Sequence, residues 1–464
     1  MVESSDAELW HENQQLRRRV ADLEAQLQDL ARRLEEALRA GKRQAAPFRK
    51  GPPKPHPETP GRKSGAAHGR HGHRPPPPAE QVQETHEAAL PAACPDCGGG
   101  VDATGVVSQY QTEIPRRPIV RQFHVHVGQC RRCGKRIQGR HPLQTSDALG
   151  AAASQVGPDA QAAAVLLNKQ AGLSHAKVGA VFHALFGLDL TRGASAQIGL
   201  RAATRLAPAH QAILQEVRDS GQLKVDETGW RIGGHPAWLH AWVGDRATGY
   251  AIDPRRSAAA LERVIGRDWE GVLVHDGFAS YDRFTEAVHQ QCVAHILVRA
   301  REALATATRG AVRFPRQVLD LFAAALDLRS GYRSGAVPVA ALWAAREDFD
   351  ERLLDLAARP RAVPAYRRLA SHLWRHAESW FSFLTEPSIP ATNWPAEQAI
   401  RPAVVNRKVW GGNRTAAGAA AQGVLMSVIE TCRRQARSVL DFVSETLCTF
   451  SHRNLARPVL LSTR

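Results

Sequence analysis

The stretch GQLKVDETGW, residues 221–230, joins a short apolar segment to two adjacent carboxylates. Leu223 and Val225 alternate with polar neighbours, as the residues of a half-buried β-strand do. Asp226 and Glu227 follow at once, although burying an unpaired charge costs free energy. A single acid at such a position is also compatible with a turn or a helix cap, so the interpretation depends on whether other acids are placed in the same way.

Two further acids occupy comparable positions. Asp276 ends the apolar segment GVLVHD, and the carboxyl edge of strands is where open α/β sheets bind ligands. Glu397 lies in NWPAEQAI, where Pro395 suits the first turn of a helix. A carboxylate there is equally compatible with a simple partner for the helix dipole.

Three separated carboxylates can hold a pair of Mg²⁺ ions about 3.5–4 Å apart, with Mn²⁺ as the alternative. The ions would offset the repulsion and desolvation that otherwise raise carboxyl pKa values. We therefore predict that Asp226, Asp276 and Glu397 are catalytic metal ligands. They are preferred over three nearby acids in more polar or less edge-like positions, namely Glu227, Asp268 and Asp282.

The order of elements from residue 221 onward indicates an α/β sheet. Three strand-like segments, GQLKVDE, AWLHAWVGD and GYAIDP, precede a helical segment, a fourth strand and a helix-rich region. This order predicts an RNase H-like catalytic core over 221–415 with a helical insertion at about 295–385. Residues 150–220 are expected to be helical and to include a DNA-binding region, and 416–464 to form a C-terminal helical region.

Residues 8–40 carry a heptad repeat. Leu9, Leu16, Leu23 and Leu30 recur every seventh residue, and Asn13 lies in the alternate seam. A single asparagine at such a position favours a parallel dimer. The repeat therefore predicts a coiled coil and a homodimer or higher homo-oligomer, with one helix packed on its own chain as the alternative.

Positive charge is concentrated in the chain, whose formal net charge is +16. Residues 41–78 contain nine Lys or Arg against one acid, together with ten prolines and six glycines. Such a composition neither buries a core nor forms a helix, so 41–85 is expected to be a disordered basic linker. It suits contact with DNA phosphates, although a solvated basic segment has the same composition.

Two CxxC pairs lie in CPDCGG (94–99) and CRRCGK (130–135). Two thiolates separated by two residues can bind one ion, and two such pairs supply the four sulfurs of a structural Zn²⁺ site. We expect a zinc-ribbon-like module over 86–145, although the gap between the pairs is longer than the commonest spacing. The predicted ligands of this single ion are Cys94, Cys97, Cys130 and Cys133.

Basic residues follow Glu397 in the sequence. They are predicted to bind nucleic-acid phosphates beside the active site, with a solvated face as the alternative. The residues are Arg401, Arg407, Lys408 and Arg414. Cys292 and His295, in CVAH, have a metal-like spacing but supply only two ligands, so packing or a position near DNA is favoured for them.

Four segments together resemble the catalytic blocks of the insertion sequence 66 family of bacterial transposases. They are VDETGWRIGG, VHDGFASYDRF, QCVAHILVRA and NWPAEQAIRPAVVNRKVWGG. The heptad, the basic linker, the CxxC pairs and the C-terminal GVLMSVIETCRRQARSVLDFVSETL follow the order found in that family. The resemblance implies that Asp226, Asp276 and Glu397 form the catalytic triad, in a fold similar to RNase H. It also implies accessory proteins encoded by the same element.

The expected function is that of a DNA transposase that cleaves the ends of its element and joins 3′-hydroxyls to target DNA by Mg²⁺-dependent transesterification. A zinc-containing DNA-binding regulator without catalysis, and an RNase H-like nuclease without strand transfer, are the alternatives. No apolar run reaches the roughly eighteen residues that a membrane span needs, and the first residues are polar. A cytoplasmic, nucleoid-associated protein is therefore expected.

Overall fold

The computed structural model describes ten stretches of the chain, which divide into two units, Met1–Pro115 and Arg116–Arg464. The stretches are 3–41, 75–112, 114, 118–144, 147–150, 155–305, 307, 311–359, 361–449 and 458–461. Most of the predicted linker, residues 42–74, lies outside them. Each unit is described by itself.

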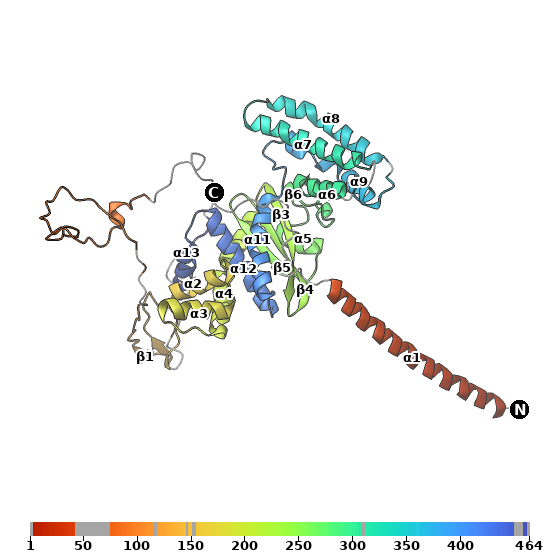
Figure 1. Ribbon diagram of the computed structural model, residues 1–464. Helices are drawn as coiled ribbons and strands as arrows, with labels where there is room; N and C mark the ends of the chain where they lie inside the picture. The colour runs from red at the N-terminus through yellow and green to blue at the C-terminus, as the bar shows by residue number, and fades with distance from the viewer. Residues whose placement is uncertain are drawn as a thin grey trace. The chain divides into compact units, whose positions relative to one another are not determined.

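The first unit contains the helix α1, Glu3–Gly41, drawn in red in Figure 1. Where its side chains are described, the heptad residues are exposed, with exposed fractions of 55% for Leu16, 55% for Leu23 and 72% for Leu27. An apolar stripe of this length suits a partner helix. The helix of the predicted coiled coil is therefore present, and its pairing stays a prediction.

The second unit is built around a five-stranded sheet in the order β5-β4-β3-β6-β7. β3 pairs antiparallel with β4, and β4 antiparallel with β5, whereas β6 and β7 run parallel to β3. The strands are β3 (Gln222–Ile232), β4 (His235–Val243), β5 (Thr248–Asp253), β6 (Gly271–His275) and β7 (Ala287–Gln291). The mixed α/β class is confirmed, with the three strands, one helix (α5, Ala258–Ile265) and fourth strand in the predicted order.

Strand β7 was not predicted, because its sequence AVHQQ is polar. The side chain of Gln290 is fully buried and makes the hydrogen bonds that a buried amide requires. Its Nε2 donates to the carbonyl oxygen of Trp380 at 3.0 Å, and its Oε1 accepts from the backbone N–H of Phe383 at 3.0 Å. Both partners are about ninety residues away, so the local sequence carries no signal of this burial.

Helices cover both faces of the sheet (Figure 1). On one face, α4 and α5 share a core with the Leu223 and Val225 side chains of β3. On the other face, α11 packs on β3 and β4. Besides α5, the α-helices of the second unit outside the insertion are, among the described residues, α2 (Pro158–Lys169), α3 (His175–Phe186), α4 (Arg192–Arg218), α11 (Trp394–Trp410), α12 (Ala416–Arg434) and α13 (Val439–Thr449). Among the described helices, none has the length and apolar character to cross a bilayer.

Helix α12 protects the edge strand β5, whose outer backbone groups have no neighbouring strand. The backbone N–H of Tyr250 donates to Ser427 Oγ at 2.8 Å, and that of Thr248 donates to Thr431 Oγ1 at 3.1 Å. Gly423 allows this close approach, because a Cβ there would lie 3.0 Å from the carbonyl oxygen of Tyr250. Hydroxyls one helical turn apart thus satisfy a strand edge that would otherwise be open to another chain.

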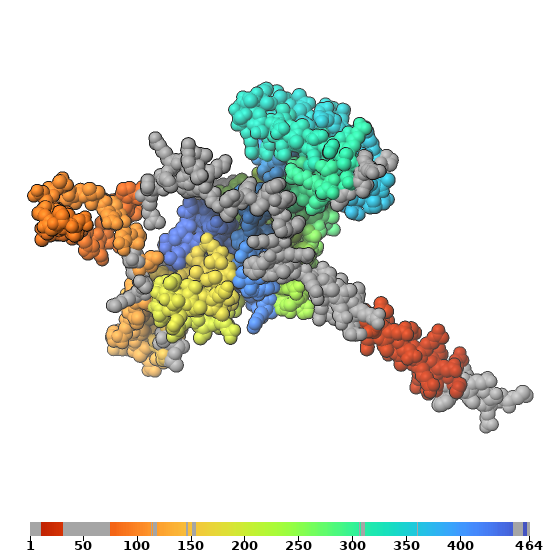
Figure 2. Space-filling model, viewed as in Figure 1, coloured from red at the N-terminus to blue at the C-terminus, as the bar shows by residue number. Residues whose placement is uncertain are grey.

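A helical insertion separates β7 from α11 and has its own apolar core. Its stacked aromatic residues include Phe322, which lies 5.3 Å from Phe381 between ring centroids. Figure 2 shows the insertion in cyan as a separate mass of the second unit. It comprises α6 (Val293–Ala305), α7 (Arg313–Arg333), α8 (Val339–Ala358), α9 (Pro364–Arg375) and α10 (Ser382–Thr385).

Candidate active site

Asp226 lies on the face of β3 that is covered by α11. Successive side chains of a strand point to opposite faces. Val225 belongs to the core under α4, so Asp226 points the other way, toward α11. Its Oδ1 accepts the backbone N–H of Glu227 at 2.9 Å. The apolar half of the strand therefore anchors it in one layer and presents the carboxylate to the other.

The parallel pairing of β3 with β6 brings Asp276 to the same place. Gln222 pairs with Val272 and Lys224 with Val274, so the same register continued by two residues sets Asp226 opposite Asp276. Neighbouring strands lie about 4.8 Å apart. Asp276 directly follows β6, and its Oδ1 accepts the backbone N–H of Phe278 at 3.0 Å. Two acids fifty residues apart in sequence are thus side by side on adjacent strands. Asp276 directly follows β6, whereas Asp226 lies within β3, so the predicted strand end at Asp226 is wrong, because β3 continues to Ile232 in its pairing with β4.

Glu397 lies in the first turn of α11, and Asn393 directly precedes that helix and holds its start in place. The fully buried Asn393 side chain donates through Nδ2 to the carbonyl oxygen of Val225, the residue before Asp226, at 2.6 Å. Its backbone N–H donates to Cys292 Sγ at 3.1 Å. Asn393 therefore ties the helix that carries Glu397 to the strand that carries Asp226.

The pKa of Asp226 also indicates that these carboxylates lie close together. Burial raises its pKa to about 8, and the negative charges of Glu227, Asp276 and Glu397 add to the effect. Like charges act in this way only at short range in a poorly solvated place. The site therefore combines several carboxylates with an excess of negative charge, and a bound cation would relieve it.

Glu227, the rival of Asp226, is occupied by other partners. Its Oε1 accepts from Arg256 Nε at 3.0 Å and its Oε2 accepts from Tyr281 Oη at 2.5 Å, and only 1% of the side chain is exposed. Burial raises its pKa, and these two hydrogen bonds oppose that change. The pairing leaves Asp226 as the acid of this strand whose carboxylate is available to a ligand.

The other two rivals lie elsewhere. Asp268 is exposed and precedes β6, so it lies near the opposite end of that strand from Asp276. Asp282 is 42% exposed and lies 3.9 Å from His376 Nδ1. Neither directly follows β6 beside Asp226, as Asp276 does.

The four basic residues predicted to bind nucleic acid separate into two kinds. Arg401, Lys408 and Arg414 are exposed. Arg407 is directed inward, where its Nη1 donates to Thr228 Oγ1 at 3.1 Å and to the carbonyl oxygen of Gly229. Burial lowers its pKa. The contacts of Arg407 favour holding α11 on β3 over the predicted phosphate contact.

The two CxxC segments form the same turn in their separate units. In the first, the N–H of Gly98 donates to the carbonyl oxygen of Cys94 at 2.8 Å. In the second, the N–H of Gly134 donates to the carbonyl oxygen of Cys130 at 2.9 Å. This turn lies between β1 (Val127–Gln129) and β2 (Arg136–Gln138). Both glycines have a positive φ, of 72° and 69°, which the turn requires.

Backbone N–H groups in each turn point at the first sulfur. The N–H of Asp96 lowers the pKa of the Cys94 thiol, and the N–H of Cys133 lowers that of Cys130. A thiolate is the form that binds a metal. Each turn thus favours the thiolate form of its first cysteine, and the joint zinc site of all four cysteines stays a prediction.

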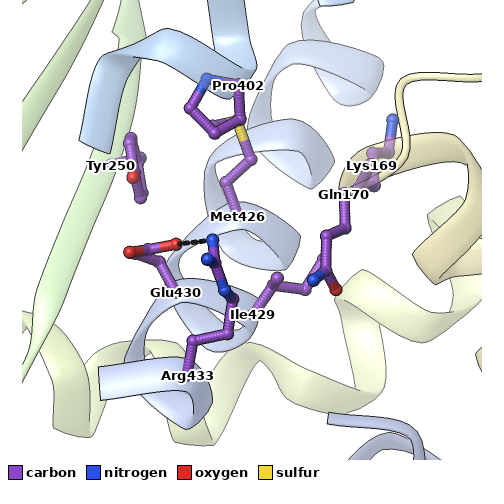
Figure 3. Close-up of a pocket in the computed structure, with 8 residues that line it drawn as sticks. All are labelled: Lys169, Gln170, Tyr250, Pro402, Met426, Ile429, Glu430 and Arg433. Atoms are coloured by element: carbon purple, nitrogen blue, oxygen red, sulfur yellow. Dashed lines mark hydrogen bonds and ion pairs between the residues drawn. The ribbon is translucent and has the colours of Figure 1, made fainter. Parts of the chain in front are cut away.

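A small cavity of about 20 Å³ lies where α2, β5, α11 and α12 meet (Figure 3). Glu430 accepts from Arg433 at 3.0 Å on one side of it. On another side, Lys169 is 7% exposed and lies 5.3 Å from the Trp410 ring centroid, and burial lowers its pKa to about 8. The cavity has room for about one water molecule, so its lining is a packing arrangement.

Comparison with known proteins adds one finding. The family model described as "Transposase IS66 family" matches residues 153–421, which is more than half of the 464-residue chain. The matched segment includes Asp226, Asp276 and Glu397 and begins after both CxxC pairs. No curated protein matches the chain.

Proposed function

The chain belongs to the transposase IS66 family, and from that premise we propose that it is the DNA transposase of an insertion sequence. In this proposal it cleaves the ends of its element and joins the freed 3′-hydroxyls to target DNA by transesterification. The observation that carries the proposal is the meeting of Asp226, Asp276 and Glu397 on the α11 side of the sheet.

The strand order supports an RNase H-like core. Three antiparallel strands at one side are continued by two strands that run parallel to the first. The sequence predicted the first four of these strands in chain order, but neither their pairing nor β7. In such a sheet a ligand site is expected at the carboxyl ends of the parallel strands. Asp276 occupies such an end, and Asp226 lies beside it, just beyond the parallel pairing of β3 with β6. The helical insertion leads from β7 to the helix that carries Glu397.

The three carboxylates fit Mg²⁺, or Mn²⁺, because these hard cations take oxygen ligands and keep several waters. Asp226, Asp276 and Glu397 would hold a pair of ions, which supply activation of the attacking oxygen and charge stabilisation at the scissile phosphate. The chain's own contribution is orientation. Asn393 sets the position of Glu397 relative to Asp226 through its bond to Val225.

Several roles around this core are part of the same proposal. Arg401, Lys408 and Arg414 are exposed near or beyond Glu397 and would contact the DNA backbone. The CxxC segments with one Zn²⁺, the helices α2 to α4 and the basic linker would recognise the element ends. α1 would pair protomers, which suits a reaction that holds two DNA ends together, and accessory proteins of the element would act with them.

The test is a strand-transfer assay with Mg²⁺ and pre-cut element ends that expose 3′-hydroxyls. Asp226→Asn, Asp276→Asn and Glu397→Gln should each lower joining by about 10² or more, since misplaced reacting groups alone cost about that factor. Asp268→Asn is the matched control, because Asp268 is exposed near the far end of β6, and it should join at the wild-type rate.

The assay also separates the alternatives. A DNA-binding regulator predicts that Asp276→Asn behaves like the wild type in every measurement. A nuclease predicts cleavage of intact ends without joined products from pre-cut ends. Joined products that disappear in the three variants would exclude both alternatives.

A further inference from the structure

A second set of metal-binding atoms adjoins the proposed catalytic acids. Cys292 Sγ, a ring nitrogen of His295 and a carboxylate oxygen of Glu397 all lie within 4.8 Å of one another. Among the described residues, this is the group of three such side chains that is close enough to hold one ion. His295 Nδ1 and Glu397 Oε1 are 3.7 Å apart, too far for a hydrogen bond but suitable for two ligands of one ion.

The fold builds this set from two helix starts. Cys292 directly precedes α6, and His295 lies in the first turn of that helix, with its N–H donating to the Cys292 carbonyl oxygen at 3.2 Å. Glu397 lies in the first turn of α11. Asn393 joins the two starts through its N–H bond to Cys292 Sγ. The three ligand atoms are therefore positioned by backbone contacts and not by one flexible loop.

The burial of the three side chains is graded. Cys292 is 1% exposed, whereas the side chains of His295 and Glu397 are 37% and 38% exposed. His295 Nδ1 is a buried atom without a hydrogen-bond partner among the described residues. The sulfur of Cys292 is thus buried, and His295 Nδ1 has no hydrogen-bond partner among the described residues. The carboxylate of Glu397 is partly open to solvent.

The sulfur decides which ions fit. Mg²⁺ takes oxygen ligands, whereas thiolate and imidazole select Zn²⁺ and related ions such as Co²⁺. Tetrahedral zinc holds sulfur at about 2.3 Å and nitrogen at about 2.0 Å, so small side-chain rotations suffice from the present positions. Three protein ligands leave the fourth position to water or another ligand. On binding, the Cys292 thiol releases its proton to solvent.

We propose that Cys292, His295 and Glu397 form a binding site for one zinc-class cation, separate from the CxxC segments. The site shares Glu397 with the carboxylates assigned to Mg²⁺, so one carboxylate serves two classes of ion. Resting on the proposed function, this sharing makes zinc an inhibitor of DNA joining, because an ion bound to Cys292 and His295 withdraws Glu397 from Mg²⁺.

The site itself is tested by Co²⁺ titration of the full chain, followed by the thiolate-to-cobalt charge-transfer absorption. Cys292→Ser and His295→Gln should each lose one equivalent of bound Co²⁺ and the absorption that belongs to it. Cys432→Ser is the matched control, because Cys432 is also a buried single cysteine but lies outside the cluster, and it should keep both. Equal titrations of the wild type and Cys292→Ser would overturn the proposal.

Two features keep the result interpretable. His295 is partly exposed, so His295→Gln tests the site even if Cys292→Ser fails to fold, and a wild-type titration in this variant also counts against the site.

The inhibition is measured separately, as the Zn²⁺ concentration that halves joining in Mg²⁺. That concentration should rise about tenfold or more in His295→Gln, because losing even a group that only supports a ligand lowers metal affinity by about tenfold or more, and His295 is itself a proposed ligand. Absence of joining in the wild type would contradict the proposed function, and the Co²⁺ result would still decide the site.

Discussion

Asp226 and Glu227 are chemically similar neighbours that the fold treats differently. Arg256 and Tyr281 take the two oxygens of Glu227, and the guanidinium of Arg256 lies 3.7 Å from the ring centroid of Phe278. Asp226 faces the other acids on the opposite side of the strand. One carboxylate thus has a structural partner, and the other keeps its oxygens for a ligand.

The raised pKa of Asp226 predicts how stability depends on pH without divalent cations. Its folded-state pKa of about 8 lies above the ordinary value of 3.8, so the folded protein holds this proton more tightly than the unfolded chain. The stabilisation is complete below about pH 4 and is lost as the pH rises through about 8. The melting temperature of metal-free protein should therefore fall between about pH 4 and pH 8, and it should fall less in Asp226→Asn. Equal pH profiles of the two proteins would contradict the assigned environment.

Asn393 is predicted to be a positioning residue. Asn393→Ala removes the bond to Val225 and should lower the rate of joining by about tenfold or more, because the geometry of Glu397 relaxes. The loss should appear in kcat with little change in DNA affinity, since Asn393 is fully buried and does not reach DNA. A purely structural role would instead lower the melting temperature and leave the rate per folded molecule unchanged.

At this scale the sequence predicted the acids but not their supports. Asp226 and Asp276 are visible because each directly follows apolar strand residues, although β3 continues beyond Asp226 to Ile232. Arg256, Tyr281 and Asn393 become visible only in the fold, since their partners lie 29, 54 and 168 residues away. Asn393 does carry one local signal, an asparagine just before a helix start, which reads as an ordinary cap.

At the scale of elements, α1 carries charges that suit a parallel pair. With Leu16 and Leu23 in the seam, Arg19 and Glu24 fall on flanking positions that face each other across a parallel dimer. Arg19→Glu should weaken dimerisation by about fivefold or more, because two attractive pairs of about 0.5 kcal/mol each are lost and like charges replace them. The exchange Arg19→Glu with Glu24→Arg should restore it. Sedimentation of the full chain measures both, and an unchanged association in Arg19→Glu would argue against this pairing.

The seam between α12 and β5 gives a stability prediction. Ser427→Ala leaves the backbone N–H of Tyr250 buried without its partner and should lower the free energy of unfolding by about 1–3 kcal/mol. Ser330→Ala, at an exposed helical position, should change it by about 0.5 kcal/mol or less. Denaturant unfolding distinguishes the two, and equal effects would mean that the hydroxyl does not satisfy the strand edge.

Strands were predicted from the sequence where their apolar pattern was strong. β3 and β6 are apolar and were predicted, whereas β7 is a strand because Gln290 bonds to residues of the insertion. Arg407 is a residue whose sequence context predicted a role that its contacts do not favour. It belongs to a basic run that predicts phosphate binding, yet its helix face turns it toward β3.

At the scale of the whole molecule, the order of modules was readable because each has its own composition. The heptad, the Pro-rich basic stretch, the CxxC pairs and the strand ends are separate signals, and the family match covers the last of these and the helices around it. The meeting of three distant acids is different, since it depends on strand register and on the path of the insertion. Those depend on contacts along the whole second unit.

The most direct test of the central claim is iron-directed cleavage of the protein backbone. Fe²⁺ bound in place of Mg²⁺ reduces added hydrogen peroxide to hydroxyl radicals that cut the nearest peptide, so the cut sites map the chain around the ion. The account predicts cuts near Asp226, Asp276 and Glu397 in the same molecule, suppressed by excess Mg²⁺ and lost together in Asp226→Asn. Cuts that avoid any of these three places, or that persist unchanged in Asp226→Asn, would contradict it.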